Sequence, residues 1–265
     1  MNSSGDKSFF HKLYIIIGLS SVIVAGLIYL IFSGGTERIQ ARNQKTAPPS
    51  SEVVDHTAEP SSTPSPSVVP SPSSEPVDVT SDDSLTRIVN QTHPINPSYV
   101  PSDLVVPDVA MNNTQTIRQE AAEPLKELFQ AASEAGYSLY LISGYRSYDE
   151  QVSLYHTYLA EFGEEYTNRL DSHPGASEHQ IGLAVDLGTT DHACELSSCF
   201  GDSGASQWLS ENAWKYGWIL RYPGDKEQVT GIMDSPWNYR YVGREEAQKI
   251  HESGLAMEEF YGLSN

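Results

Sequence analysis

Positive charge is scarce in this sequence of 265 residues. Lys and Arg together number 16 against 35 Asp and Glu, so the formal net charge is −19. Proteins that bind nucleic acid carry basic surfaces, and adsorption to an anionic lipid surface also depends on Lys and Arg. The composition therefore argues against nucleic acid and against flat lipid adsorption, and the acidic excess favours solubility.

Cysteine is equally rare, because the chain contains only Cys194 and Cys199. No cysteine directly follows the apolar segment near the N-terminus, which argues against a lipoprotein signal. If the chain is exported, the two residues are expected to form a disulfide that closes a short loop. A pair of free thiols and a pair of metal ligands are the alternatives.

A nearly uninterrupted apolar segment covers residues 14–32. As a helix it would span about 28 Å, close to the hydrocarbon thickness of a bilayer. It is longer than the apolar core of a usual signal peptide, so we predict an uncleaved transmembrane anchor after a cytoplasmic tail of residues 1–13. A cleaved signal peptide is the alternative. Basic residues stand on both sides of the segment, so positive charge does not fix its orientation.

The composition changes again after the apolar segment. Pro, Ser, Thr and acidic residues dominate without any apolar period, most clearly in residues 60–67. Such a stretch cannot bury enough surface to fold, and its spaced prolines keep it extended. We therefore predict a disordered Pro/Ser-rich linker over residues 33–100 and a folded domain over residues 101–265.

Helical and strand patterns alternate irregularly in the folded part. Ser147 and Glu150 form a capping-box pattern, and Gly136 and Gly217 are typical helix stops. We expect helices over residues 116–135, 147–162, 207–216 and 245–252, and strands over residues 138–142, 182–187, 218–222 and 236–242. This order predicts an α+β fold, with a small, mainly antiparallel sheet and packed helices.

His179 and Asp186 are the first candidates for chemistry. The histidine precedes a segment that reads as a strand, and the aspartate lies on that strand, so the two side chains can meet. Imidazole and carboxylate are ligands that zinc takes from proteins. Taken alone, such a pair is more often a surface histidine before a buried strand that ends in a solvated aspartate, and the wider sequence reverses this preference.

Several further motifs surround this pair in a fixed order. They are Ser143-Gly144-Tyr145-Arg146-Ser147, Gln151, Pro174-Gly175-Ala176-Ser177-Glu178-His179, Gly182-Leu183-Ala184-Val185-Asp186, Leu220-Arg221-Tyr222-Pro223 and Pro236-Trp237-Asn238-Tyr239-Arg240-Tyr241-Val242-Gly243. In this order and spacing the chain resembles the VanY-type D-alanyl-D-alanine carboxypeptidases, which are zinc enzymes of bacterial cell walls. The resemblance covers about residues 103–262.

The resemblance implies roles for individual residues. It identifies His179 and Asp186 with two zinc ligands of the family and Arg146 with its substrate or transition-state arginine. Ser177 matches a hydrogen bond to substrate. Gln151 helps to shape the pocket, and Trp237 belongs to the substrate-binding wall.

The resemblance also implies a cellular setting. The partners are peptidoglycan peptides that end in D-Ala-D-Ala, together with the membrane through the N-terminal helix. The location is the bacterial cell membrane, with a single span and the C-terminal domain outside the cytoplasm.

The last motif departs from the family pattern at two positions. The family has glutamate as general base where this chain has Ser235, and histidine as third ligand where it has Asn238. Serine is not a carboxylate base, and an amide carbonyl is a poor zinc ligand beside imidazole. Two protein ligands hold zinc weakly, so the site is expected to bind zinc weakly or not at all.

Three functions follow from this departure. The first is a domain that recognises D-Ala-D-Ala peptide ends after losing most or all of its zinc-dependent hydrolysis. The second is an active D,D-carboxypeptidase that uses a substitute base and third ligand, for which Asp234 and His173 are the nearest candidates. The third is a structural or interaction domain of the cell envelope.

Overall fold

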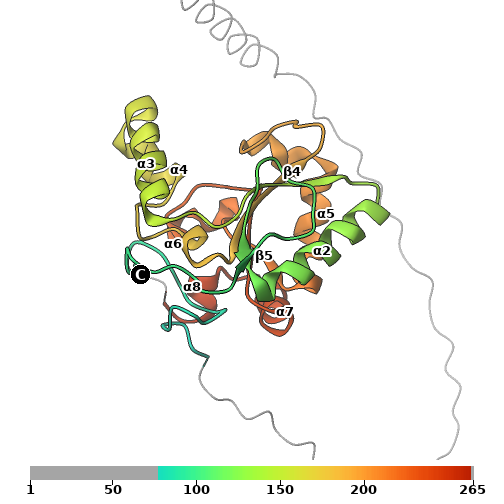
Figure 1. The fold of residues 1–265 in the computed structure, drawn as a ribbon, viewed down its shortest axis with the longest axis horizontal. Coiled ribbons are helices and arrows are strands. Elements are labelled where there is room, and N and C mark those ends of the chain that lie inside the picture. Colours follow the sequence, from blue (N-terminus) through green and yellow to red (C-terminus); the bar gives the residue numbers. More distant parts are fainter. Residues whose placement is uncertain (1–76, 264–265) are drawn as a thin grey trace, which may run out of the picture. The chain divides into compact units, whose positions relative to one another are not determined.

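The computed structural model describes residues 77–263, and the fold is built around a four-stranded antiparallel sheet (Figure 1). The strand order is β3-β4-β6-β5, and two short strands, β1 and β2, form a separate ladder. The strands are β1 (Leu104–Val105), β2 (Ile117–Arg118), β3 (Leu139–Ser143), β4 (Ala184–Thr189), β5 (Trp218–Leu220) and β6 (Asn238–Tyr241). The predicted α+β class and the mainly antiparallel sheet are therefore confirmed.

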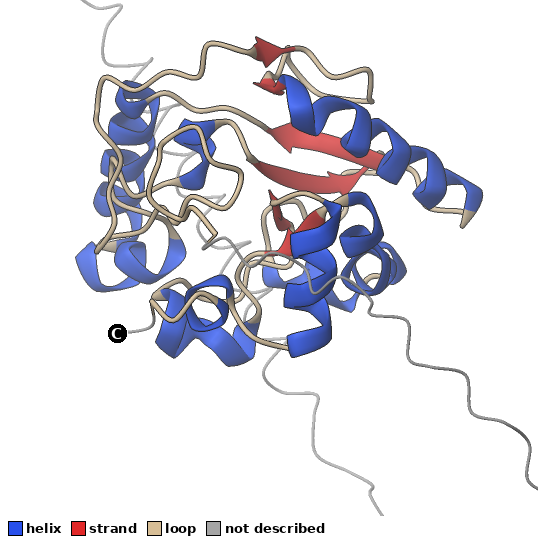
Figure 2. Cartoon of the chain, turned by 90° about the horizontal axis from the view of Figure 1, so that it is seen from below, coloured by secondary structure: helices blue, strands red, loops and turns tan. Residues whose placement is uncertain are grey.

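Helices cover the sheet on more than one side (Figure 2). They are α2 (Gln119–Glu134), α3 (Tyr148–Phe162), α4 (Glu164–Leu170), α5 (Gly204–Asn212), α6 (Glu227–Thr230), α7 (Arg244–Ser253) and α8 (Met257–Phe260). Along α2, residues Ala121, Leu125, Leu128 and Ala132 are fully buried, at the spacing of one helix face. This face packs into the main core together with the inner side of the sheet.

The start of α3 follows from its sequence. The Ser147 Oγ accepts the backbone N–H of Glu150, and the Glu150 carboxylate accepts the backbone N–H of Ser147 at 2.8 Å. This reciprocal pair supplies partners for N–H groups that a helix leaves free in its first turn. The predicted helix of residues 147–162 is confirmed, whereas α4 lies outside all of the predicted helices and strands.

The register of the sheet brings two key residues together. Asp186 on β4 pairs with Asn238 on β6, and on its other side it pairs with Ser143 on β3 after a local irregularity. Directly opposed residues in an antiparallel pair place their side chains on the same face of the sheet. The register of β4 therefore places Asp186 between Ser143 and Asn238.

The domain begins earlier than its composition suggests. Ile88, Val89 and Ile95 are buried at 0%, 0% and 3% exposure, and the Arg240 guanidinium donates to the backbone oxygens of Leu85 and Arg87. The predicted linker is therefore too long at its C-terminal end, since residues 77–100 pack on the domain. A few apolar residues in this segment suffice because the body of the domain provides the surface that they cover.

The predicted tail, anchor and most of the predicted linker lie outside the described residues. Within residues 77–263, no helix combines the length and the apolar character needed to cross a bilayer. Cys194 and Cys199 are joined by a disulfide, with their Cα atoms 5.6 Å apart. The loop that they close follows β4 and carries Leu196 to the edge of the cavity described next.

Candidate functional site

Most of the predicted site residues border one cavity of about 270 Å³. Its lining includes seven of them, namely Arg146, Ser177, His179, Asp186, Ser235, Trp237 and Asn238. Gln151 is only 1% exposed and lies behind Arg146. Sequence motifs that are separated by up to about 90 positions therefore meet in one place, as expected for a binding or catalytic site.

His179 is held in a defined orientation. It lies in a short 3₁₀ turn, Glu178–Ile181, which ends at Gly182 with φ +67°, a conformation that favours glycine. The His179 Nδ1 is 2.7 Å from the backbone oxygen of Gly144. A carbonyl oxygen only accepts hydrogen bonds, so Nδ1 carries a proton, and Nε2 lies 3.4 Å from Asp186 Oδ2 at the cavity.

Asn238 bridges the two remaining metal-type side chains. Its Nδ2 donates to Asp186 Oδ1 at 2.8 Å and to His179 Nε2 at 3.2 Å. The carboxylate accepts hydrogen bonds only, which fixes the amide nitrogen rather than the oxygen on this side. Burial opposes ionisation of Asp186, but the polar and cationic groups around it outweigh burial, so the pKa of Asp186 lies below its ordinary value.

Arg146 supplies positive charge to the cavity wall. Its Nη1 donates to Gln151 Oε1 at 2.8 Å, its Nη2 donates to Ser143 Oγ at 3.1 Å, and Nη2 lies 3.6 Å from Asp186 Oδ2. These contacts fix the plane of the guanidinium while part of it stays open to the cavity. A planar, fixed guanidinium is suited to a carboxylate ligand.

Ser235 does not offer a base. Its Oγ donates to the backbone oxygen of Met233 at 3.0 Å, and its backbone N–H donates to Tyr222 O. The two proposed substitutes lie elsewhere: Asp234 is exposed, the His173 ring packs against Tyr155 at 4.7 Å, and neither borders the cavity. The geometry thus gives no support to a substitute base or ligand from these residues.

The residues present do not fit a zinc ion. In residues 77–263 no three side chains of His, Cys, Asp and Glu gather as a ligand set. Asn238 already satisfies His179 Nε2 and Asp186 Oδ1, and its own Oδ1 is buried without a hydrogen-bond partner among the described residues. Turning the amide would break both bonds and offer a carbonyl oxygen, which is a weak zinc ligand.

The cavity also contains residues that the sequence motifs did not indicate. Asp171 contributes a carboxylate, while Tyr158, Phe162 and Tyr166 form an aromatic wall on α3 and α4. Burial raises the pKa of Asp171, although Arg146 and hydrogen bonds oppose the effect. The four-residue spacing of Leu154, Tyr158 and Phe162 was a usable signal for the wall, whereas the position of Asp171 depends on the path of a loop.

Comparison with known proteins agrees with the sequence motifs. The VanY family model, described as D-alanyl-D-alanine carboxypeptidase, matches residues 114–244. A putative carboxypeptidase, YodJ, of Bacillus subtilis is 38% identical over 188 residues, which cover 69% of this chain and 69% of that protein. The residues matched by the family model contain the predicted ligand, arginine and last-motif positions.

Two solved structures share the fold. The LdcB LD-carboxypeptidase matches with a TM-score of 0.64 and 38% identity, covering 69% of this chain and 88% of that one. A variant of the vancomycin-resistance D,D-pentapeptidase VanY, in complex with Zn(II), matches with a TM-score of 0.57 and 33% identity. The match covers 66% of this chain and 97% of that one. By motifs, family model and fold, this chain belongs to the VanY family of D-alanyl-D-alanine carboxypeptidases.

Proposed function

We propose that this protein is a membrane-anchored, extracytoplasmic member of the VanY family that binds peptide ends of D-Ala-D-Ala type without zinc-dependent hydrolysis. One observation carries the proposal: the Asn238 amide links His179 Nε2 and Asp186 Oδ1 at 3.2 and 2.8 Å. A zinc peptidase needs a third protein ligand and a carboxylate base. Asn238 and Ser235 stand at those two motif positions and supply neither.

Recognition of the ligand rests on groups that remain. Arg146 is held by Gln151 and Ser143, so it can bind a terminal carboxylate without first losing conformational freedom. Ser177 borders the same cavity and is 3% exposed, which suits a hydrogen bond to the ligand backbone. Trp237 adds an apolar surface for small side chains such as methyl groups.

The anchoring part of the proposal rests on sequence alone. Residues 14–32 are apolar over a length that matches the hydrocarbon core. A domain that binds cell-wall peptides has to stand outside the cytoplasm, and the Pro/Ser-rich stretch after the apolar segment is typical of a spacer. Membrane fractionation of cells that express the full chain, or the chain without residues 14–32, tests this part.

Two measurements on the purified full chain test the site. Mass spectrometry should find far less than one zinc per chain after dialysis against zinc. Calorimetric titration with N-acetyl-D-Ala-D-Ala should show binding that Arg146→Ala weakens at least about tenfold, since hydrogen bonds to charged groups contribute about 1.5–3 kcal/mol. Arg169→Ala is the matched control, because Arg169 is exposed and outside the cavity lining. Stoichiometric zinc with chelator-sensitive release of D-Ala would overturn the proposal.

A further inference from the structure

A second cavity, of about 340 Å³, lies beside the cavity described above. The two cavities share Ser172, Tyr222 and Ile232, which therefore form the partition between them. Most of the other lining comes from residues 90–92, from the α4 residues 168–169 and from residues 228–231, none of which borders the first cavity. The second cavity is thus a separate candidate for binding, outside the residues that the motifs indicate.

Charge is nearly absent from the lining of the second cavity. Among the described residues, Arg169 is the one charged side chain that borders it, and the Arg169 Nε lies 2.6 Å from Glu227 Oε1. The whole chain contains 35 Asp and Glu, yet no carboxylate of the described part borders this cavity. A neutral ligand suits such a lining, because an ion would lose hydration without gaining a partner of opposite charge.

Uncharged polar side chains form the rim of the cavity. Gln91, Thr92 and Gln228 are exposed there, and Asn168 is half-buried. Neither glutamine side chain forms a hydrogen bond with another described residue, so both amides are available to a ligand. Amides and hydroxyls each donate and accept hydrogen bonds, and a ligand with several hydroxyl or amide groups matches both abilities.

The Asn168 amide has a defined orientation. Its Oδ1 accepts a hydrogen bond from the Tyr155 hydroxyl. The two N–H bonds of the amide are therefore the end that a ligand in the cavity can use.

The turn that carries Gln91 is fixed by its own side chains. The Asn90 Oδ1 accepts the backbone N–H groups of Thr92 at 3.1 Å and of His93 at 2.9 Å. The Asn90 Nδ2 donates to Glu258 Oε1 at 3.2 Å, which ties the turn to a buried carboxylate. This wall of the cavity is therefore in place without a ligand.

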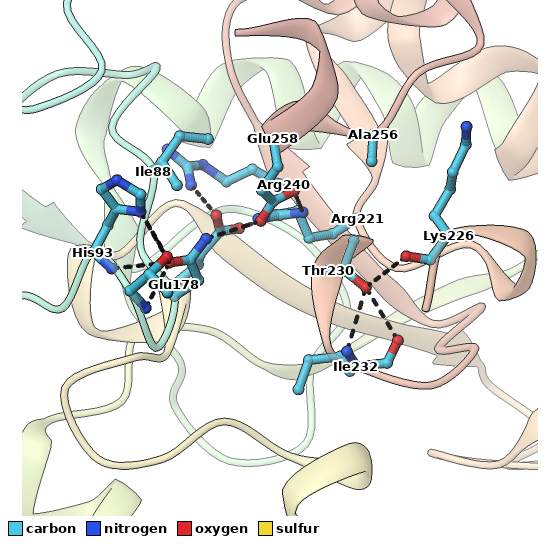
Figure 3. Close-up of polar contacts among 12 residues, drawn as sticks. Ile88, His93, Glu178, Arg221, Lys226, Thr230, Ile232, Arg240, Ala256 and Glu258 are labelled. Atoms are coloured by element: carbon cyan, nitrogen blue, oxygen red, sulfur yellow. Dashed lines mark hydrogen bonds and ion pairs between the residues drawn. The ribbon is translucent and has the colours of Figure 1, made fainter. Parts of the chain in front are cut away.

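The opposite end of the lining is also held by hydrogen bonds. The Thr230 Oγ1 lies 3.3 Å from the backbone oxygen of Lys226 and 3.1 Å from that of Ile232 (Figure 3). The backbone N–H of Met233 donates to the Arg169 oxygen at 2.7 Å, which joins this segment to α4. Because these walls are preformed, a ligand loses little affinity to ordering them.

Buried apolar groups lie beneath the polar rim. Ala176, Tyr222 and Ile232 border the cavity and are all less than a tenth exposed. A pyranose ring matches this arrangement, since it has C–H groups on its faces and hydroxyls around its edge. The C–H face can pack on the apolar floor while the edge meets the amides and hydroxyls of the rim.

We propose that the second cavity binds a neutral saccharide that carries an acetamido group. The sugar ring packs on Tyr222 and Ile232, its hydroxyls bond Asn168, and its acetamido group pairs with the side-chain amides of Gln91 and Gln228. The proposal does not depend on the peptide end bound in the first cavity, because Arg146 does not border the second.

Three neutral probes test the site by calorimetric titration of the purified full chain. They are N,N′-diacetylchitobiose, cellobiose, which has hydroxyls in place of the acetamido groups, and N-acetyl-glycyl-glycinamide, which has amides and no hydroxyls. We expect diacetylchitobiose to bind at least about threefold more tightly than cellobiose, as for one additional neutral hydrogen bond. The peptide amide should not displace it.

Variants of the rim locate the binding. Gln91→Ala and Gln228→Ala should each weaken diacetylchitobiose about threefold to tenfold, because each removes a hydrogen-bonding amide. Both residues are exposed, so the thermal unfolding midpoints should stay at the wild-type value. Gln207→Ala is the matched control, since Gln207 is exposed on α5 and does not border the cavity, and its affinity should equal that of wild type.

Each contrary result overturns the saccharide site. These results are no saturable binding of diacetylchitobiose, equal binding of cellobiose, or wild-type affinity in both rim variants. Displacement by the peptide amide would mean that the cavity takes peptide backbones instead. None of these results affects binding of N-acetyl-D-Ala-D-Ala that depends on Arg146, so the saccharide site and the proposed function can fail separately.

Discussion

Asn238 stands where the resemblance to the family implies a histidine, and its amide donates to both side chains that the same resemblance assigns to a metal. The carboxylate of Asp186 needs a donor, and the Nε2 lone pair of His179 needs one as well. A side-chain NH₂ group has two N–H bonds and serves both acceptors at once. The substitution therefore leaves a satisfied hydrogen-bonded cluster in place of an unpaired buried charge, which would be costly.

The sequence predicted these residues because motif positions carry chemistry that does not depend on distant packing. The spacing of His179 and Asp186 made them candidates, the resemblance to the family gave them and Arg146 their expected roles, and the register of β4 and β6 explains why Asn238 faces Asp186. Asp171 was not predicted. It lies in the segment between α4 and the 3₁₀ turn, where no periodic pattern indicates which side chains turn inward.

The double change Ser235→Glu with Asn238→His is expected to restore zinc binding. The surrounding motif residues keep the strand frame, so an imidazole at position 238 would join His179 and Asp186 as a third ligand with one open position. The glutamate would supply the missing proton acceptor. Zinc per chain, measured by mass spectrometry after dialysis, should rise from well below one to about one.

Turnover is the more demanding half of that prediction, because a catalytic geometry also needs its supporting residues in place. Release of D-Ala from a D-Ala-D-Ala-terminated peptide should require zinc and stop with a chelator. Each single change should do less than the pair, since the base and the metal-bound water act as a unit. Asn238→Ala is the control, and zinc binding by it would show that the third ligand is unnecessary.

At the scale of elements, a buried ion network connects the site to the C-terminal helix α8 (Figure 3). Arg221 lies between two carboxylates: it contacts Glu178 Oε2 at 2.9 Å and Glu258 Oε1 at 2.6 Å. Arg240 on β6 lies 2.7 Å from Glu178 Oε1. All four side chains are at most 2% exposed, so none of them can exchange its partner for water.

This network ties the 3₁₀ turn before β4 to other parts of the fold. Glu178 is the residue directly before His179, and both of its carboxylate oxygens face arginines on other elements. The elements α2, α3 and β4 could be predicted from local periodicity and caps. The short helix α8 could not, because it is held by Glu258 and the neighbouring core rather than by its own pattern.

Glu258→Gln should lower the free energy of unfolding by about 3 kcal/mol, because it leaves part of a buried arginine charge uncompensated. Urea unfolding followed by circular dichroism measures the difference. Glu252→Gln is the matched control: Glu252 is exposed on α7 and bonds only Gln248, so its change should stay within about 0.5 kcal/mol. Equal stabilities of the two variants would mean that the network contributes nothing.

The same network predicts a loss of stability in acid. Burial raises the pKa of Glu258, but Arg221 outweighs it, so the pKa in the folded state lies below the ordinary value of 4.5. A carboxyl whose folded pKa is depressed stabilises the fold fully above its unfolded pKa, and this contribution disappears as pH falls through the folded pKa. As the pH is lowered below about 4.5, the urea midpoint of wild type should therefore decrease more steeply with pH than that of Glu258→Gln. Parallel pH profiles would contradict this assignment.

At the scale of the whole described domain, the N-terminal segment is part of the fold rather than a connection to it. The prediction extended the Pro/Ser-rich linker to residue 100, although residues 77–100 contain only two Pro and three Ser. Burial of a few residues decided otherwise: Ile88 joins the smaller core cluster with α7, and Val89 and Ile95 join the main core. Such long-range contacts leave no local periodic signal, which is why the sequence placed the boundary too late.

Truncation measures how much this segment contributes. A chain that begins at residue 101 would lose the side chains of Ile88, Val89 and Ile95 from the core, and fully burying a side chain of this size contributes about 1.5–3 kcal/mol. It would also remove the Leu85 and Arg87 carbonyls from the fully buried Arg240 guanidinium, leaving N–H groups without acceptors. Together these losses are comparable to the whole stability of a typical domain. We therefore expect a fragment of residues 77–265 to unfold cooperatively on heating and a fragment of residues 101–265 to lack a cooperative transition or to aggregate. Equal melting profiles of the two fragments by circular dichroism would show that residues 77–100 are dispensable for the fold.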